Sequence, residues 1–278
     1  MLEKRHEKYG KEGRMKSKYR NAYFLIGAGI TAVLALLALI GCFYTPYDPD
    51  AMDLAAKNTG VSWQHWMGCD NFGRDIFSRV MEGIRNTFFI SVATVGIGTF
   101  FGLLVGALTG YFGGILDEVL MRVNDALFSF PSILLALVMV SLLGRGTVNV
   151  TLALGIAFIP SFARIIRSEY MKQKGLDYVA SARLMGASHL RIIFVHILPN
   201  IFPILLSSVM IGFNNAVLAE AGLSYLGIGI QPPDASLGRM LSEAQSFLFT
   251  IPWYAVFPGL MIVLMVLGFS MMSEGLNE

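Results

Sequence analysis

One charged connection between hydrophobic segments, residues 177–188, carries residue types suited to contact with a soluble partner. Residues 176–185 are rich in helix formers, and the side chains at positions 180–182 are small enough for another surface to approach the backbone. Gly186 can end that helix, and Ser188 can cap a following one. The pattern predicts two short helices joined by a hinge, and the chemistry that it suits is non-covalent docking.

Polar side chains also occur within apolar segments, where an ionisable group is costly unless it faces protein or water. Asn214, Asn215 and Glu220 lie in or at the end of one such segment. Two interpretations stay open for them: they border a polar path through the membrane, or they brace neighbouring helices. Asp125, beside Phe128-Ser129-Phe130-Pro131, is predicted to cap a helix just inside the cytoplasmic face.

The sequence offers no catalytic centre. It has no Gly-x-x-x-x-Gly-Lys-Ser/Thr loop for nucleotide phosphates, no nucleophile elbow and no zinc-protease motif. No Cys or His cluster has the spacing of a metal site, since the four histidines are scattered. We therefore expect no catalytic residue, no metal site and no cofactor bound by this chain.

The elements that must position these residues are membrane helices. With 278 residues, 55% of them hydrophobic and only 14% charged, the chain has more apolar surface than one soluble core would hide. The composition predicts an all-α, polytopic membrane protein.

Uncharged windows divide the chain into parts. A basic segment at 1–20 precedes a first span at 21–47, which is long enough to cross a bilayer and is interpreted as a retained span, with a cleaved signal peptide as the alternative. An extracytoplasmic segment at 48–85 follows, then a five-helix core at 86–273 and a tail at 274–278. The core windows are 86–116, 126–144, 146–163, 192–219 and 244–273.

The sequence also predicts how two of its helices are arranged. Only Gly144-Arg145-Gly146 separates the windows 126–144 and 146–163, which predicts a tight helical hairpin. Ile76, Arg79 and Val80 suggest a helix that lies along the membrane interface, with Trp66 at headgroup depth.

The basic residues predict the orientation. Six spans place both termini and the connection at 177–188 on the same side of the membrane. That side carries 15 of the 21 Lys and Arg residues, so we expect it to be cytoplasmic.

The spacing of the docking connection resembles a known family. Three residues separate Ala180-Ser181-Ala182 from Gly186, and nine more separate Gly186 from His196-x-Leu198-Pro199. This resembles the EAA loop of permease subunits of binding-protein-dependent ABC importers. The family pattern begins Glu-Ala-Ala and has a branched apolar residue where this chain has His196, and the peptide and nickel branch commonly replaces the glutamate.

Three further blocks resemble the dipeptide, oligopeptide and nickel branch of that family. Residues 67–75 resemble Leu-Gly-Thr-Asp-x-x-Gly-Arg-Asp, with Met67 and Cys69 in place of leucine and threonine. Residues 220–229 resemble Glu-Ala-x-Leu-Ser-Phe-Leu-Gly-Leu-Gly, and residues 231–241 resemble Gln-Pro-Pro-x-x-Ser-Trp-Gly-x-Met-Leu, with leucine in place of tryptophan. The residues of the first block taken as an extracytoplasmic signature are Gly68, Asp70, Gly73, Arg74 and Asp75.

The resemblance implies a type I ABC importer permease fold with six spans and a cytoplasmic coupling helix between spans 4 and 5, in an EAA-like loop at 169–199. It implies a plasma-membrane protein with a cytoplasmic N-terminus. The residues implied to contact the ATPase are Asp177, Tyr178, Ala180, Ser181, Ala182, Arg183, Gly186, Ala187 and Ser188. Its implied partners are a second permease, two ATPases that use ATP and Mg, an extracytoplasmic solute-binding protein and the lipid bilayer, with no nucleic acid.

Three functions stay open at this point. The first is import of di- or oligopeptides, the second is import of nickel or a metal chelate by the same machine, and the third is an ATP-independent transporter or channel. Whether Cys42 and Cys69, both toward the external side, form a disulfide also stays open, with unpaired cysteines as the default interpretation.

Overall fold

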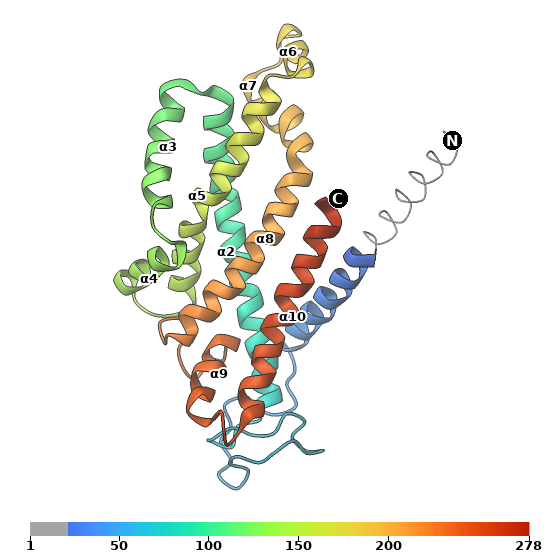
Figure 1. Cartoon of the computed structure of the whole chain (residues 1–278), viewed down its shortest axis with the longest axis vertical. Helices are drawn as coiled ribbons and strands as arrows, with labels where there is room; N and C mark the ends of the chain where they lie inside the picture. The colour runs from blue at the N-terminus through green and yellow to red at the C-terminus, as the bar shows by residue number, and fades with distance from the viewer. Residues whose placement is uncertain (1–21, 278) are drawn as a thin grey trace, which may run out of the picture.

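The computed structural model describes residues 22–277, which form a helical bundle (Figure 1). The first described helix is Ala22–Ile40. The other elements are α2 (Ile76–Phe112), α3 (Gly114–Phe128), α4 (Ser132–Leu143), α5 (Thr147–Lys174), α6 (Asp177–Leu184), α7 (His189–Arg191), the π-helical turn η1 (Ile192–Ile197), α8 (Leu198–Tyr225), α9 (Leu237–Ala244), the 3-10 turn η2 (Gln245–Phe247) and α10 (Pro252–Asn277). The predicted all-α fold is confirmed, and the basic segment predicted at 1–20 lies outside the described residues.

Six predicted spans correspond to five continuous helices and one bent pair. The helices long and apolar enough to cross a membrane are Ala22–Ile40, Ile76–Phe112, Thr147–Lys174, His189–Tyr225 and Pro252–Leu276. α3 and α4 make the sixth when they are taken as one span. The tight turn predicted at residues 144–146 is present, because α4 ends just before it and α5 starts just after it.

The window 126–144 is not one straight helix. α3 and α4 meet at 87°, at a break beside Pro131. Proline lacks a backbone N–H and restricts the residue before it, so the helix stops there. The prediction that Asp125 caps this span was wrong: Asp125 lies in the last turn of α3, and its carboxylate pairs with Arg164 of α5 at 2.6 Å.

α2 starts earlier than its uncharged window, at Ile76, where the Asp75 carboxylate accepts a hydrogen bond from the Ser78 backbone N–H at 2.8 Å. The segment expected to lie as a helix along the interface is therefore the first turn of α2. Its charges are tolerated because they have partners: Arg79 pairs with Asp50 at 3.1 Å.

Among the elements from α2 to α10, the most extensive contact is between α2 and α5. It depends on a glycine at every fourth position of α2, from 98 to 110. A Cβ added at Gly102 would lie 2.5 Å from the Phe162 Cβ, and one added at Gly106 would lie 2.6 Å from the Ala163 carbonyl oxygen. Small residues at four-residue spacing let two membrane helices approach backbone to backbone. α2 and α5 therefore form a rigid pair.

The two ends of the bundle carry different elements (Figure 1). α6 projects from one end, while α9 and the long connection between the first helix and α2 lie at the other. The docking connection and the extracytoplasmic segment predicted from the sequence therefore lie at opposite ends of the molecule.

Replacement of Gly106 by Ala is expected to destabilise the protein by about 1–3 kcal/mol, because the added methyl group meets backbone atoms of α5 that cannot move aside. The measurement is thermal unfolding of the purified protein in lipid nanodiscs. Gly96→Ala is the matched control on the same helix, since its Cβ would have no atom within 4 Å. Equal melting temperatures for the two variants would show that close packing of α2 on α5 does not determine the stability of the protein.

Candidate functional site

The loop between α5 and α8 folds as the sequence pattern predicts, with a short helix, a glycine turn and a second helix start. After α6, Gly186 has φ +80°, and the backbone N–H groups of Gly186 and Ala187 donate to the carbonyls of Arg183 and Ala182 at 2.9 and 3.0 Å. This is a Schellman motif, which glycine favours because the conformation is left-handed. The Ser188 hydroxyl then accepts from the Arg191 N–H at 3.4 Å and caps the next helix.

α6 has one face turned to the protein and the other to solvent. Val179 and Ala182 are buried in a cluster with Ile192 and Ile193 of η1. At its tip, Leu184 is 90% exposed and Met185 is 81% exposed. An apolar tip held at the end of a bundle suits contact with another protein.

The predicted contact residues are distributed over both faces of this loop. Ala182 is buried, Tyr178 and Ala187 are half-buried, and the remaining positions are exposed: Asp177, Ala180, Ser181, Arg183, Gly186 and Ser188. The exposed set includes small residues beside the apolar tip.

Specific polar contacts join this loop to the bundle. The Tyr170 hydroxyl of α5 donates to the Ile193 carbonyl oxygen at 3.2 Å, and the Tyr178 hydroxyl donates to Gln173 Oε1 at 2.9 Å. Tyr111 of α2 lies 2.9 Å from His189 Nδ1. The loop is therefore attached to α2 and α5 through short, direct contacts.

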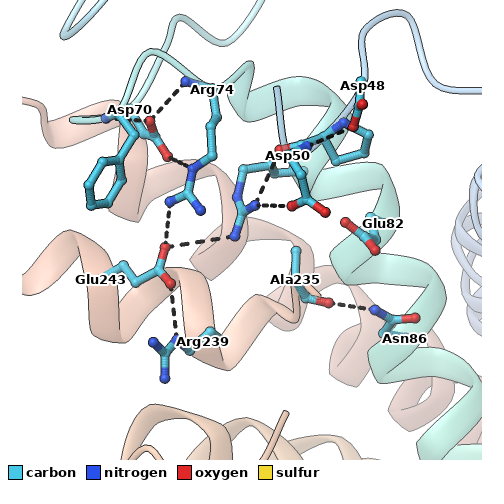
Figure 2. A network of polar contacts seen from close by, with 12 residues as sticks. Asp48, Asp50, Asp70, Arg74, Glu82, Asn86, Ala235, Arg239 and Glu243 are labelled. Carbon is cyan, nitrogen blue, oxygen red and sulfur yellow. Dashed lines mark hydrogen bonds and ion pairs between the residues drawn. The ribbon is translucent and has the colours of Figure 1, made fainter. Parts of the chain in front are cut away.

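The signature residues at the opposite end form a buried charge network (Figure 2). The Arg74 guanidinium donates to Asp70 at 2.6 Å and to Glu243 of α9 at 2.9 Å. Glu243 also accepts from Arg239 at 3.0 Å and from the Tyr254 hydroxyl at 2.7 Å. The network ties the loop before α2 to α9 and α10, which are far away in the sequence.

The other signature residues give this loop its shape. Gly68 and Gly73 have φ values of +76° and +77°, and a Cβ at Gly73 would overlap the Asp53 backbone. The Asp70 carboxylate accepts from the backbone N–H groups of Phe72 and Arg74 at 2.8 and 3.0 Å. Asp75 caps α2. All five signature residues thus have a structural contact in the loop.

Charge partners set the ionisation of Glu243. Burial alone would raise the pKa of its carboxyl, but hydrogen bonds from Tyr254 and Arg239, together with Arg74 and Arg79, hold the pKa below its usual range. The sequence analysis missed Glu243 and Tyr254. The Arg239–Glu243 spacing is visible as an i,i+4 pair on a helix, but nothing local indicates its link to Arg74.

A cavity of about 430 Å³ lies between α4, α5 and α8. Its lining is largely apolar, with polar side chains from Ser132, Ser161, Ser208 and Asn215. Both α5 and α8 run from this cavity to the EAA-like loop, so one loop is covalently joined to two of the three helices that line the cavity.

The three polar residues of α8 lie in different surroundings. Asn215 lines the cavity. Asn214 donates to the Ser270 hydroxyl of α10 at 2.8 Å. Glu220 is fully buried and accepts from the Ser224 hydroxyl at 2.6 Å. The structure therefore does not bring the three together. Both cysteines, Cys42 and Cys69, are free thiols.

Comparison with known proteins identifies the family. Residues 98–278 match the family described as binding-protein-dependent transport system inner membrane component. The chain belongs to this family. It is therefore an ABC transporter permease subunit, and the predicted fold and multi-pass inner membrane location are confirmed.

Two relatives illustrate its similarity. The permease is 37% identical to the dipeptide transport system permease protein DppC of Haemophilus influenzae, over 93% of this chain and 90% of the relative. It is 38% identical to the glutathione transport system permease protein GsiD of Pectobacterium atrosepticum, over 94% of this chain and 87% of the relative.

A solved structure shares the fold. An inward-facing structure of the MetNI methionine ABC transporter superposes with a TM-score of 0.57 at 18% identity, and the match covers 72% of this chain and 97% of that chain. At this identity the likeness concerns the fold alone.

The charge network generates a prediction for pH dependence. The pKa of Glu243 is lower in the folded permease than in the unfolded chain, so its stabilising contribution is fully present above the ordinary value of 4.5 and is lost as the pH falls through the folded value. Replacement by Gln is expected to cost roughly 1–3 kcal/mol at pH 7 and to flatten the fall in melting temperature as the pH drops below the ordinary value of 4.5.

The measurement is the melting temperature as a function of pH. Glu118→Gln is the control, because Glu118 forms an exposed pair with Arg122 on α3. If Glu243→Gln and the control gave the same pH profile, the network would not be a source of stability.

Proposed function

We propose that this permease forms part of the path of an ATP-driven importer that passes di- or oligopeptides from an extracytoplasmic binding protein to the cytoplasm. The observation that carries the proposal is the attachment of α6 to the path. α6 stands at the end of the bundle with an apolar tip, and the two helices on either side of its loop line the cavity. A force applied to α6 therefore reaches the cavity through two helices.

The relatives support a peptide substrate. They are named for dipeptide and glutathione transport. The nickel alternative considered from the sequence is not favoured, and an ATP-independent transporter or channel does not fit a binding-protein-dependent family.

The proposed assembly contains a second permease, two ATPases and the binding protein, in the bilayer and without nucleic acid. ATP and Mg act at the ATPases, and this chain binds no nucleotide. The N-terminus lies in the cytoplasm, on the same side as the loop that meets the ATPases. This orientation rests on the distribution of Lys and Arg along the chain.

Coupling requires that ATP stabilises one state of the assembly over another. We assign the ATPase contact to the exposed positions of the loop, together with Leu184 and Met185. Ala182 and Val179 would not touch the ATPase directly, since they are buried, and they instead fix α6 to η1. Movement of α6 would then shift α5 and α8, which line the cavity.

The extracytoplasmic signature has a supporting role in this proposal. Because Arg74, Asp70 and Glu243 hold the long loop to α9, they keep the outer surface in one shape for the binding protein.

Crosslinking tests the proposed contact. With the exposed Cys42 replaced by Ser, Met185→Cys labelled with a maleimide photocrosslinker is expected to crosslink to an ATPase subunit of the purified transporter on illumination. Phe249→Cys is the matched control, because Phe249 is fully exposed on the segment between α9 and α10, at the other end of the bundle. Absence of an ATPase crosslink from Met185→Cys in an assembled transporter would refute the contact.

A second prediction separates the path from its supports. Asn215→Leu is expected to lower ATP-driven peptide uptake at least about tenfold, because it replaces the amide that the cavity offers to a polar substrate. Glu220→Gln keeps a hydrogen-bonding group beside Ser224 and is expected to leave uptake within about twofold of the wild type.

Both variants are compared in proteoliposomes at matched protein content. Loss of uptake in Glu220→Gln with full uptake in Asn215→Leu would reverse the assignment and place Glu220 at the path.

A further inference from the structure

Three side chains with different metal-binding atoms meet in the extracytoplasmic loop, outside the residues used for coupling or transport. They are the imidazole of His65, the thiol of Cys69 and the carboxylate of Asp75. One ligand atom from each lies within 4.8 Å of the other two. Cys69 and Asp75 are buried, and the His65 side chain is 20% exposed.

The backbone holds these three residues in place. Cys69 and Asp75 form an isolated antiparallel bridge, closed by hydrogen bonds from Asp70 N–H to the Arg74 carbonyl and from Ile76 N–H to the Gly68 carbonyl, each at 3.0 Å. This small loop fixes the separation of the thiol and the carboxylate.

Separate contacts hold His65 in place. Its backbone N–H donates to the Ser62 hydroxyl at 3.0 Å, and its carbonyl accepts from the Gly68 N–H at 2.9 Å. The imidazole stacks near Tyr47, with ring centroids 4.8 Å apart. The three ligands are therefore positioned by the fold before any ion binds, which lowers the entropic cost of binding.

A small tetrahedral ion would require modest shifts of these side chains, whose ligand atoms lie within 4.8 Å of one another. Bond lengths of about 2.0 Å to nitrogen and oxygen and about 2.3 Å to sulfur place tetrahedral ligand atoms roughly 3.3–3.6 Å apart. His65 Nδ1 and Asp75 Oδ1 are 2.9 Å apart, so they need to separate only slightly. Asp75 Oδ2 is occupied by the Ser78 N–H and hydroxyl at 2.8 Å, which leaves Oδ1 to bind and keeps the carboxylate oriented.

The local electrostatics favour a cation. Burial raises the pKa of the Cys69 thiol most. A hydrogen bond with Thr59 lowers this pKa, and the negative charges of Asp75, Asp70 and Asp53 each raise it by a smaller amount. The same carboxylates that oppose a bare thiolate attract a metal ion, and a thiol that coordinates such an ion is deprotonated.

We propose that His65, Cys69 and Asp75 form a binding site for a divalent transition-metal ion of the zinc type, with solvent in the fourth position. On binding, the thiol proton passes to solvent and the imidazole binds through a neutral nitrogen. Thiolate, imidazole and carboxylate together match the ligand preference of zinc.

The site would act on the shape of the outer loop. His65 and Cys69 belong to the long connection, whereas Asp75 caps α2, so a bound ion would clamp the connection to the start of α2. The proposed ion has a structural role. The proposal therefore does not depend on the identity of the transported substrate.

Cobalt(II) titration of the purified transporter tests the site, because cobalt replaces zinc and shows visible d–d bands and a near-ultraviolet thiolate charge-transfer band. The wild type and Cys42→Ser are expected to show the thiolate band, and excess zinc is expected to remove it. Cys69→Thr is expected to lose the band, and His65→Gln to bind cobalt at least about tenfold more weakly.

Thermal unfolding provides a second readout on the same samples. Zinc is expected to raise the melting temperature of the wild type and of Cys42→Ser but not that of Cys69→Thr. Absence of a thiolate band in the folded wild type would overturn the proposal without reference to any variant. Equal cobalt affinity in Cys69→Thr and the wild type would also overturn it.

Discussion

The glycines of α2 allow the backbone of α5 to approach so closely that larger side chains at those positions would not fit. Every Cβ placed on the inner face from Gly98 to Gly110 would press on α5. In lipid there is no hydrophobic drive between helices, so close packing of this kind is a main source of association. The position of α5 then fixes one wall of the cavity and one end of the EAA-like loop.

From this rigid pair, the two ends of the permease acquire different properties. At one end, α6 is held by two buried residues and a few polar contacts and presents an apolar tip to solvent. At the other, buried charges join segments that are distant in sequence, with Glu243 shared by Arg74, Arg79 and Arg239. In the function that we propose, the first end transmits movement to the cavity and the second keeps the shape of the outer surface. This division of roles suits a machine whose motor and binding protein act on opposite faces.

The outer loop shows how one segment can hold several kinds of interaction. Its glycines set the turns, its arginines and carboxylates connect it to α9, and His65, Cys69 and Asp75 bring metal-binding atoms together beside that network. Cys69 stands at a buried position where the pattern that this segment resembles has threonine, and the thiol gives that position a different chemistry.

The sequence by itself determined the helical membrane fold, the tight turn at residues 144–146, the Schellman turn at Gly186 and the cap at Ser188, because these follow from composition and from neighbours a few residues apart. It also led to the family through the spacing of its motifs. Only the tertiary structure decided the break at Pro131, the partner of Asp125, the different surroundings of Asn214, Asn215 and Glu220, and the link from Arg74 to Glu243. Those features depend on which faces of distant helices meet, and a local pattern does not encode that.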